Sequence, residues 1–200
     1  MSAGADSVGF IVATTHHSED GLTVPQARVL SSATPVFVDR VLVTHATDPD
    51  AILHLADEVG VDVIQVHGEV SRETVRSVWR RRGGRRIVAV VHVTGAEAVE
   101  SAVDVAGMAD AVLLDSRTET RLGGTGLTHD WQISRQIARA LDDIGRPVIL
   151  AGGLDGANVA EAIRVVRPFG VDANSRLKNT HGRKDAAACT AFVAAARIPA

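Results

Sequence analysis

Short apolar runs rich in β-branched residues recur along the whole chain and alternate with helical patterns. We expect seven strands, at residues 8–12, 37–43, 61–66, 87–93, 111–114, 147–150 and 170–173. Between them, apolar residues spaced three and four apart predict amphipathic helices, as at Ile52, Ala56 and Val59 ahead of Gly60. Strands that are apolar throughout, each followed by a helix, indicate parallel strands covered by helices.

The pattern is consistent with two α/β architectures, a doubly wound open sheet and a TIM-type (β/α) barrel. A dinucleotide-binding open sheet would carry Gly-x-Gly-x-x-Gly directly after its first strand, and residues 13–21 hold no such fingerprint. The glycine-rich segments come late, where barrels place a phosphate site. We therefore predict a (β/α) barrel with seven βα units, forming one domain over residues 1–200 without an internal linker.

Composition narrows the classes of protein that fit this fold. A single cysteine, Cys189, allows neither an internal disulfide nor a thiolate metal cluster, which makes a reducing cytoplasm the expected location. The net charge of −3 gives no electrostatic case for a nucleic-acid or anionic-membrane partner. Because no apolar run approaches the roughly 18 residues of a membrane span, we expect a soluble protein.

The loops at the carboxyl ends of the strands form the active face of a barrel. Here they carry many polar side chains, namely His16, His17, His45, Gln65, His67, His92, Asp115, Asp172, Asn174, Ser175 and Arg176. Asp115 is the strongest single candidate, because a carboxyl at the mouth of the apolar run 112–114 is partly shielded from water, as suits a general acid. The alternative is that Asp115 serves only as a cap or loop hydrogen-bond acceptor.

Glycines and small polar residues follow two late, adjacent strands. Gly152 and Gly153 would let backbone N–H groups approach an anion, and the start of a following helix would add its positive dipole end. Arg176, beside Asn174 and Ser175, could clamp a phosphate or a carboxylate. The alternative for these glycines is a tight strand-to-helix turn.

Other conspicuous residues favour structural interpretations. The rim histidines come from separate loops without metal-ligand spacing, so we expect no metal site. The arginine-rich run 80–86 fits a solvated helix end better than a nucleic-acid patch. Cys189, in an alanine-rich helix, fits a small core residue.

Six motifs then appear in order and at regular intervals, at residues 4–10, 63–68, 113–116, 123–126 with 130–131, 150–153 with 158–159, and 168–172 with 182–185. Together they resemble phosphoribosylanthranilate isomerase, a (β/α)8 barrel of tryptophan biosynthesis. The resemblance implies an Amadori rearrangement without a cofactor, in which an acid protonates the ribose ring oxygen and a base removes the proton from the neighbouring carbon. It implies that Asp115 is the acid.

The same resemblance implies a set of substrate-binding residues. Gly152, Gly153 and Ser175 match the phosphate-binding loops of the family, and Gln65, His67 and Asp172 match polar residues at the barrel mouth. With Gly124, Asn174 and Arg176 they make up the expected contacts to a phosphorylated sugar substrate.

Three departures from the family pattern shape the expected chemistry. The chain starts about one βα unit too late to contain the family's Lys-Ile-Cys-Gly strand, whose cysteine is the base. The arginine expected near residues 18–22 is missing, and residues 174–178 read Asn-Ser-Arg-Leu-Lys in place of Ser-Ser-Gly-hydrophobic-Glu. His16, His17 or His45 could replace the base, because imidazole titrates near neutral pH.

A missing first unit would also leave two strand edges unpaired. Residues encoded upstream, a partner chain such as a second copy, or closure with fewer strands would each resolve this. The leading prediction is a phosphoribosylanthranilate isomerase-like enzyme. The alternatives are a relative acting on another sugar phosphate, an inactive paralogue that binds a phosphorylated ligand or a partner, and, third, a metal-dependent lyase.

Overall fold

The computed structural model describes residues 3–14, 20–68, 70–118, 121–122 and 130–197. The chain divides into two compact units. The N-terminal unit consists of Ala5–Val90 and Gly107–Asp110, and the C-terminal unit of Met1–Gly4, Val91–Ala106 and Ala111–Ala200. All seven predicted strands are present, with boundaries that differ by a few residues.

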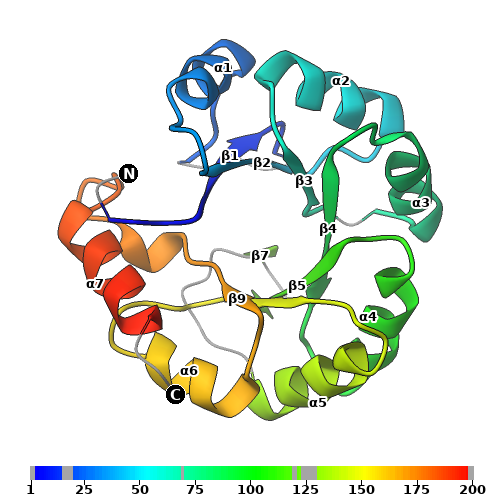
Figure 1. Cartoon of the computed structure of the whole chain (residues 1–200), viewed down its shortest axis with the longest axis vertical. Helices are drawn as coiled ribbons and strands as arrows, with labels where there is room; N and C mark the ends of the chain where they lie inside the picture. The colour runs from blue at the N-terminus through cyan, green and yellow to red at the C-terminus, as the bar shows by residue number, and fades with distance from the viewer. Residues whose placement is uncertain (1–2, 15–19, 69, 119–120, 123–129, 198–200) are drawn as a thin grey trace. The chain divides into compact units, whose positions relative to one another are not determined.

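The N-terminal unit holds the strands β1 (Ser7–Val12), β2 (Asp39–Thr44), β3 (Val63–Val66) and β4 (Arg86–His92), whose last two residues belong to the other unit. Adjacent strands in this order pair in parallel. Figure 1 shows the helices α1 (Val24–Ser32), α2 (Pro49–Val59) and α3 (Arg72–Arg81) on one side of these strands. The predicted βα repeat is therefore confirmed in this unit.

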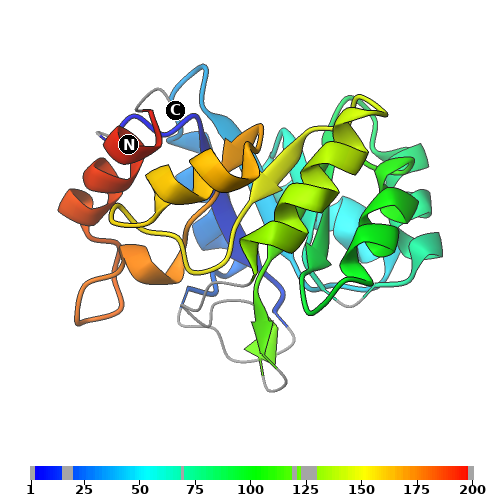
Figure 2. The same cartoon turned by 90° about the horizontal axis from the view of Figure 1, so that it is seen from below.

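The C-terminal unit repeats the arrangement with β5 (Ala111–Asp115), β8 (Val148–Leu150) and β9 (Gly170–Val171), again paired in parallel. Its helices are α4 (Ala98–Ala106), α5 (Trp131–Asp142), α6 (Val159–Val166) and α7 (Ala186–Ala196), with a 3-10 turn η1 at Ser175–Leu177. A short antiparallel hairpin, β6 (Arg117–Thr118) with β7 (Arg121–Leu122), follows β5 and projects beyond its end in Figure 2. The apolar pattern did not predict this hairpin, because its residues are mostly polar.

Helix α2 illustrates how the sequence sets the boundaries of an element. Asp48 accepts a hydrogen bond from the Ala51 N–H at 2.9 Å, and Pro49 occupies the first helical position. Gly60 ends the helix in the left-handed conformation, with φ of 72°. Ile52, Ala56 and Val59 are buried, as their spacing predicts.

The strand expected at residues 37–43 begins later than the sequence indicated. Phe37 has a φ of 71° and is 99% exposed, so the pairing with β1 starts only at Asp39. The arginine-rich run is a helix end, as expected. Its charges are matched by acidic partners, with Arg81 paired to Asp50 and Arg85 to Asp57.

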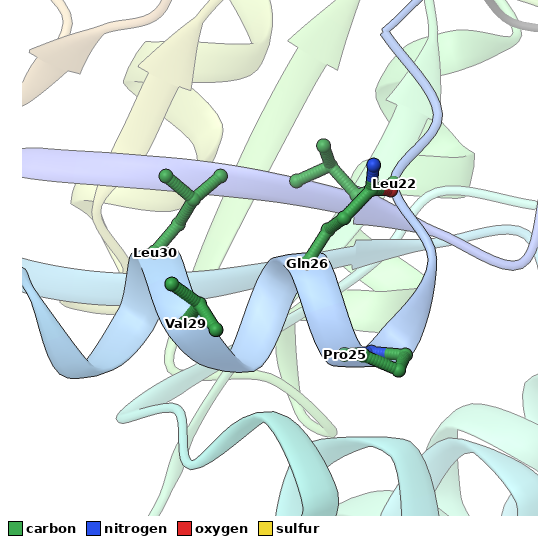
Figure 3. Close-up of a pocket in the computed structure, with 5 residues that line it drawn as sticks. All are labelled: Leu22, Pro25, Gln26, Val29 and Leu30. Carbon is green, nitrogen blue, oxygen red and sulfur yellow. The ribbon is translucent and has the colours of Figure 1, made fainter.

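Strand β1 is the edge of the N-terminal unit. Within the described residues of that unit its one strand partner is β2, and an isolated bridge adds Leu22, whose N–H donates to the Ile11 carbonyl at 2.8 Å. Next to this edge a groove of about 440 Å³ is lined by Leu22, Pro25, Gln26, Val29 and Leu30. Figure 3 shows these side chains along α1 and the segment that leads into it.

Candidate active site

Asp115 ends strand β5 with its side chain almost fully enclosed. The residue is 5% exposed, and the four residues before it, Ala111–Leu114, form the apolar body of the strand. Oδ1 of Asp115 accepts a hydrogen bond of 2.8 Å from the Ser116 N–H, while its backbone carbonyl accepts one of 2.9 Å from Val93. The carboxyl group is therefore held in one orientation.

The loop after β8 lies against the end of β5. The Ala151 N–H donates to the Leu114 carbonyl at 2.8 Å, and the next residue, Gly152, has a φ of 86°. A Cβ at Gly152 would lie 2.6 Å from the Ser116 backbone nitrogen and closer still to its Oγ. Only glycine fits this approach, which brings the loop beside Asp115.

The rest of this loop is held together by hydrogen bonds of the Asn158 side chain, just before α6. Its Nδ2 donates to the Gly153 carbonyl at 2.9 Å, and its Oδ1 accepts from the Asp155 N–H at 2.9 Å. Gly153 also has a positive φ, of 65°. Two successive glycines with positive φ and the start of a helix make a backbone arrangement suited to binding an anion.

The loop after β9 forms the third part of this cluster. The Asp172 N–H donates to the Leu150 carbonyl at 2.9 Å, so residues 172–176 emerge beside the β8 loop. Asn174 and Ser175 are half-buried, while Asp172 and Arg176 are exposed. Nζ of Lys184 donates to the Asn174 carbonyl at 2.8 Å, and Nη1 of Arg176 donates to Oδ2 of Asp155 at 2.8 Å.

Asp155 is a residue that the sequence did not single out. The Arg176 guanidinium, together with the N–H groups of Ala157 and Asn158, holds the pKa of its carboxyl below the ordinary value of 3.8. Asp155 is therefore ionised at neutral pH and neutralises part of the charge of Arg176. In the sequence, Asp155 is an acidic residue between the glycine pair and the predicted helix. That position by itself indicates only a residue that caps the start of the helix.

A second cluster lies in the N-terminal unit, where β2 and β3 end. The rings of His45 and His67 stack with centroids 5.5 Å apart and an interplanar angle of 16°. Nε2 of Gln65 lies 3.0 Å from Nδ1 of His67, within hydrogen-bonding distance. His45 and Gln65 are buried, at 5% and 7% exposure.

Backbone contacts fix this second cluster in place. The His67 N–H donates to the Thr44 carbonyl at 2.9 Å. A Cβ at Gly68 would lie 2.8 Å from the His45 carbonyl oxygen, so the chain after β3 passes directly over His45. The structure thus brings His45, which the sequence placed after the second strand, together with Gln65 and His67, which it placed after the third.

Some predicted site residues fall outside the described part of the chain, namely His16, His17 and Gly124. Among the residues that are described, no three or more His, Cys, Asp or Glu side chains are grouped so that they could hold a metal ion. In the same residues, no helix combines the length and apolar character needed to cross a membrane.

Comparisons with known proteins decide the family. Residues 1–195 match the family model described as N-(5'phosphoribosyl)anthranilate (PRA) isomerase. The chain belongs to the phosphoribosylanthranilate isomerase family. The isomerase of Haloferax volcanii is 42% identical over 196 residues, which cover 98% of this chain and 85% of that protein.

Solved structures agree with this assignment. The isomerase from Thermotoga maritima matches with a TM-score of 0.85 and 33% identity, over 98% of this chain and 90% of that chain. A phosphoribosylanthranilate isomerase in complex with reduced 1-(o-carboxyphenylamino)-1-deoxyribulose 5-phosphate matches with a TM-score of 0.80 and 29% identity, covering 98% and 89%. The predicted TIM-type fold, family and isomerase function are confirmed.

The contact between Gly152 and Ser116 gives a direct test of how this family member assembles its site. Both Gly152 and Gly145 have positive φ, but a Cβ at Gly145 meets nothing within 4 Å. Gly145→Ala should therefore cost only backbone strain, about 1 kcal/mol, whereas Gly152→Ala should cost about 1–3 kcal/mol more from the clash and should also reduce activity. Urea unfolding and initial rates measure both effects, and equal losses in the two variants would contradict the close packing.

Proposed function

We propose that this chain catalyses the isomerisation of N-(5'-phosphoribosyl)anthranilate to the corresponding 1-amino-1-deoxyketose phosphate. Protonation of the ribose ring oxygen lets its bond to C1 break as the amine nitrogen forms a double bond to C1. Loss of the proton on C2 then gives an enol that tautomerises to the ketone, so no atom is gained or lost. The observation that carries this proposal is the buried Asp115 carboxyl beside the Gly152–Gly153 loop.

Asp115 is proposed as the general acid. Its Oδ1 accepts the Ser116 N–H, which holds the carboxyl beside the β8 loop. Because the carboxyl ends a buried strand, its position relative to the neighbouring loops is fixed before substrate binds. A positioned acid of this kind contributes about 10²- to 10⁴-fold to a proton-transfer step.

The phosphate group is proposed to bind at the β8–α6 and β9–η1 loops. Gly152 and Gly153 offer backbone N–H groups ahead of α6, and Asn174, Ser175 and Arg176 lie on the adjacent loop. The relative crystallised with a 5-phosphate ligand supports a phosphorylated sugar as the substrate class. Asp172, on the β9–η1 loop, is a further proposed substrate contact, and Gly124 remains a prediction from the sequence.

His45 is proposed as the general base, with Gln65 and His67 as substrate-contacting neighbours. The Gln65 amide fixes the His67 ring, and the stacked ring of His45 is held in turn. A base fixed in one orientation loses little entropy when it takes up a proton. The other base candidates, His16 and His17, remain predictions from the sequence.

We also propose that two copies of the chain associate through β1 and α1. The groove on α1 exposes Val29 and Leu30, at 68% and 48%. Leu22, which also lines the groove, forms a bridge to Val12 at the end of β1. Among the described residues of the N-terminal unit, β2 is the one partner strand of β1, and a strand edge of this kind can pair with another chain. A two-fold dimer would use the same edge from each copy.

Replacing Asp115 tests the acid. Asp115→Asn keeps an oxygen to accept the Ser116 N–H but cannot deliver a proton, so kcat should fall about 10²- to 10⁴-fold while inorganic phosphate still binds. Steady-state rates, followed by loss of substrate fluorescence, and calorimetric titration measure the two properties. Asp142→Asn, on the exposed end of α5, is the control, and unchanged turnover by Asp115→Asn would rule out the assignment.

Replacing His45 tests the base. His45→Asn and His45→Gln should each lower kcat about 10²- to 10⁴-fold and remove the fall in rate at acid pH that protonation of a base causes. The measurement is a pH–rate profile, with melting temperature recorded for each variant. His54→Asn, at an exposed position on α2, should leave the profile unchanged. If both His45 variants fold and their rates still fall at acid pH as in the unsubstituted chain, His45 is excluded as the base.

A charge placed in the α1 groove tests the dimer. Val29→Asp should shift the protein from dimer to monomer in sedimentation-velocity runs at micromolar concentration, because it would bury an unpaired carboxylate. Val103→Asp, on the exposed side of α4, is the matched control and should leave the sedimentation coefficient unchanged. A monomeric unsubstituted chain would refute the dimer outright.

A further inference from the structure

An ion pair joins the two proposed phosphate loops of the C-terminal unit. Asp155 lies between β8 and α6, and Arg176 lies in the η1 turn after β9. Nη1 of Arg176 is 2.8 Å from Oδ2 of Asp155, and the two side chains are 40% and 24% exposed. At this exposure the attraction itself contributes little to stability. Its main consequence is the position it gives to the guanidinium.

Asp155 provides a rigid anchor for that position. Its Oδ1 accepts hydrogen bonds from the N–H groups of Ala157 at 2.8 Å and Asn158 at 3.1 Å. Its own N–H donates to Oδ1 of Asn158 at 2.9 Å, and Asn158 also binds the Gly153 carbonyl. The anchor is therefore tied through Asn158 to the glycine pair proposed to receive the phosphate.

The segment that carries Arg176 is held from its other side. Lys184 donates to both the carbonyl and the side-chain oxygen of Asn174, and the Leu177 N–H donates to the same carbonyl at 3.1 Å. With the backbone of η1 held in this way, the contact with Asp155 directs the end of the Arg176 side chain toward the β8–α6 loop.

We propose that Asp155 is a positioning residue for phosphate binding, because its ion pair holds Arg176 between the β8–α6 and β9–η1 loops. This inference rests on the proposed function, which places the phosphate at these loops. Asp155 does not bind the phosphate itself. It acts through Arg176, whose guanidinium supplies the positive charge and directed N–H donors that an anion requires.

Two physical effects predict opposite results when the Asp155 charge is removed. Coulomb repulsion alone predicts tighter phosphate binding, since a carboxylate near a dianion is unfavourable. Positioning predicts weaker binding, because an unanchored arginine must be ordered each time the anion binds. The sign of the change therefore distinguishes the two effects.

The experiment compares Asp155→Asn, Arg176→Gln and the double variant. Asp155→Asn keeps Oδ1 as the acceptor for the N–H groups of Ala157 and Asn158, just ahead of α6, and changes only the atom that faces Arg176. We expect each single variant to raise the Kd for inorganic phosphate and the KM for phosphoribosylanthranilate about tenfold, with kcat within about twofold. The double variant should match Arg176→Gln alone, because the two residues act as one unit.

Glu161→Gln is the matched control. It removes the charge of another carboxylate–arginine pair in the same unit, in which Arg164 Nε donates to Glu161 Oε2 at 2.7 Å on the exposed side of α6, and should change neither constant. Phosphate binding that is unchanged or tighter in Asp155→Asn would overturn the inference, as would a lower melting temperature with unchanged Kd and KM. A further loss in the double variant would also overturn it, since Asp155 would then act independently of Arg176.

The unsubstituted chain separates this inference from the proposed function. If it turns over phosphoribosylanthranilate and binds inorganic phosphate, the proposed function stands whatever the variants do. If it does neither, the proposed function fails and the positioning role fails with it.

Discussion

The parallel pairing of apolar strands is the constraint on which the site depends. A strand buried on both faces must satisfy its backbone N–H and C=O groups by pairing with neighbouring strands. In the C-terminal unit, Leu114 is opposite Leu150 and Leu150 is opposite Val171. This register places Asp115, Gly152 and Asp172 at the carboxyl ends of neighbouring strands, although they are far apart in the sequence. In the N-terminal unit, pairing of Thr44 with Val66 sets His45 beside His67 in the same way.

Much of this arrangement could be predicted from the sequence, because it follows from local pattern. Apolar runs such as 111–114 predict buried strands, and a strand direction determines which residues come at its carboxyl end. The glycines at positions 152 and 153 predicted a close backbone approach to an anion or a tight turn, and in the structure Gly152 also lies against the backbone and side chain of Ser116. Family membership was predicted from motifs in order, which depend on the same spacing.

The features that the sequence did not predict depend on contacts between loops. Asp155 and Arg176 are 21 residues apart, and nothing in either segment alone indicates that they pair. The stacking of His45 on His67 requires the register of β2 on β3, which a one-residue shift would change. The β6–β7 hairpin is built mostly from polar residues without alternation, so hydrophobic periodicity does not predict it.

The departure at residues 174–178 gains a physical explanation from these contacts. An arginine in place of a glycine brings a charge that phosphate can use, but also a long side chain with about 2 kcal/mol of rotamer entropy to lose on ordering. Asp155 limits that cost by ordering the side chain before the anion arrives. The carboxylate reduces the net positive field at the loops in exchange. Because a phosphate needs donors in the right place as much as it needs charge, a fixed and partly neutralised guanidinium can bind it better than a free one.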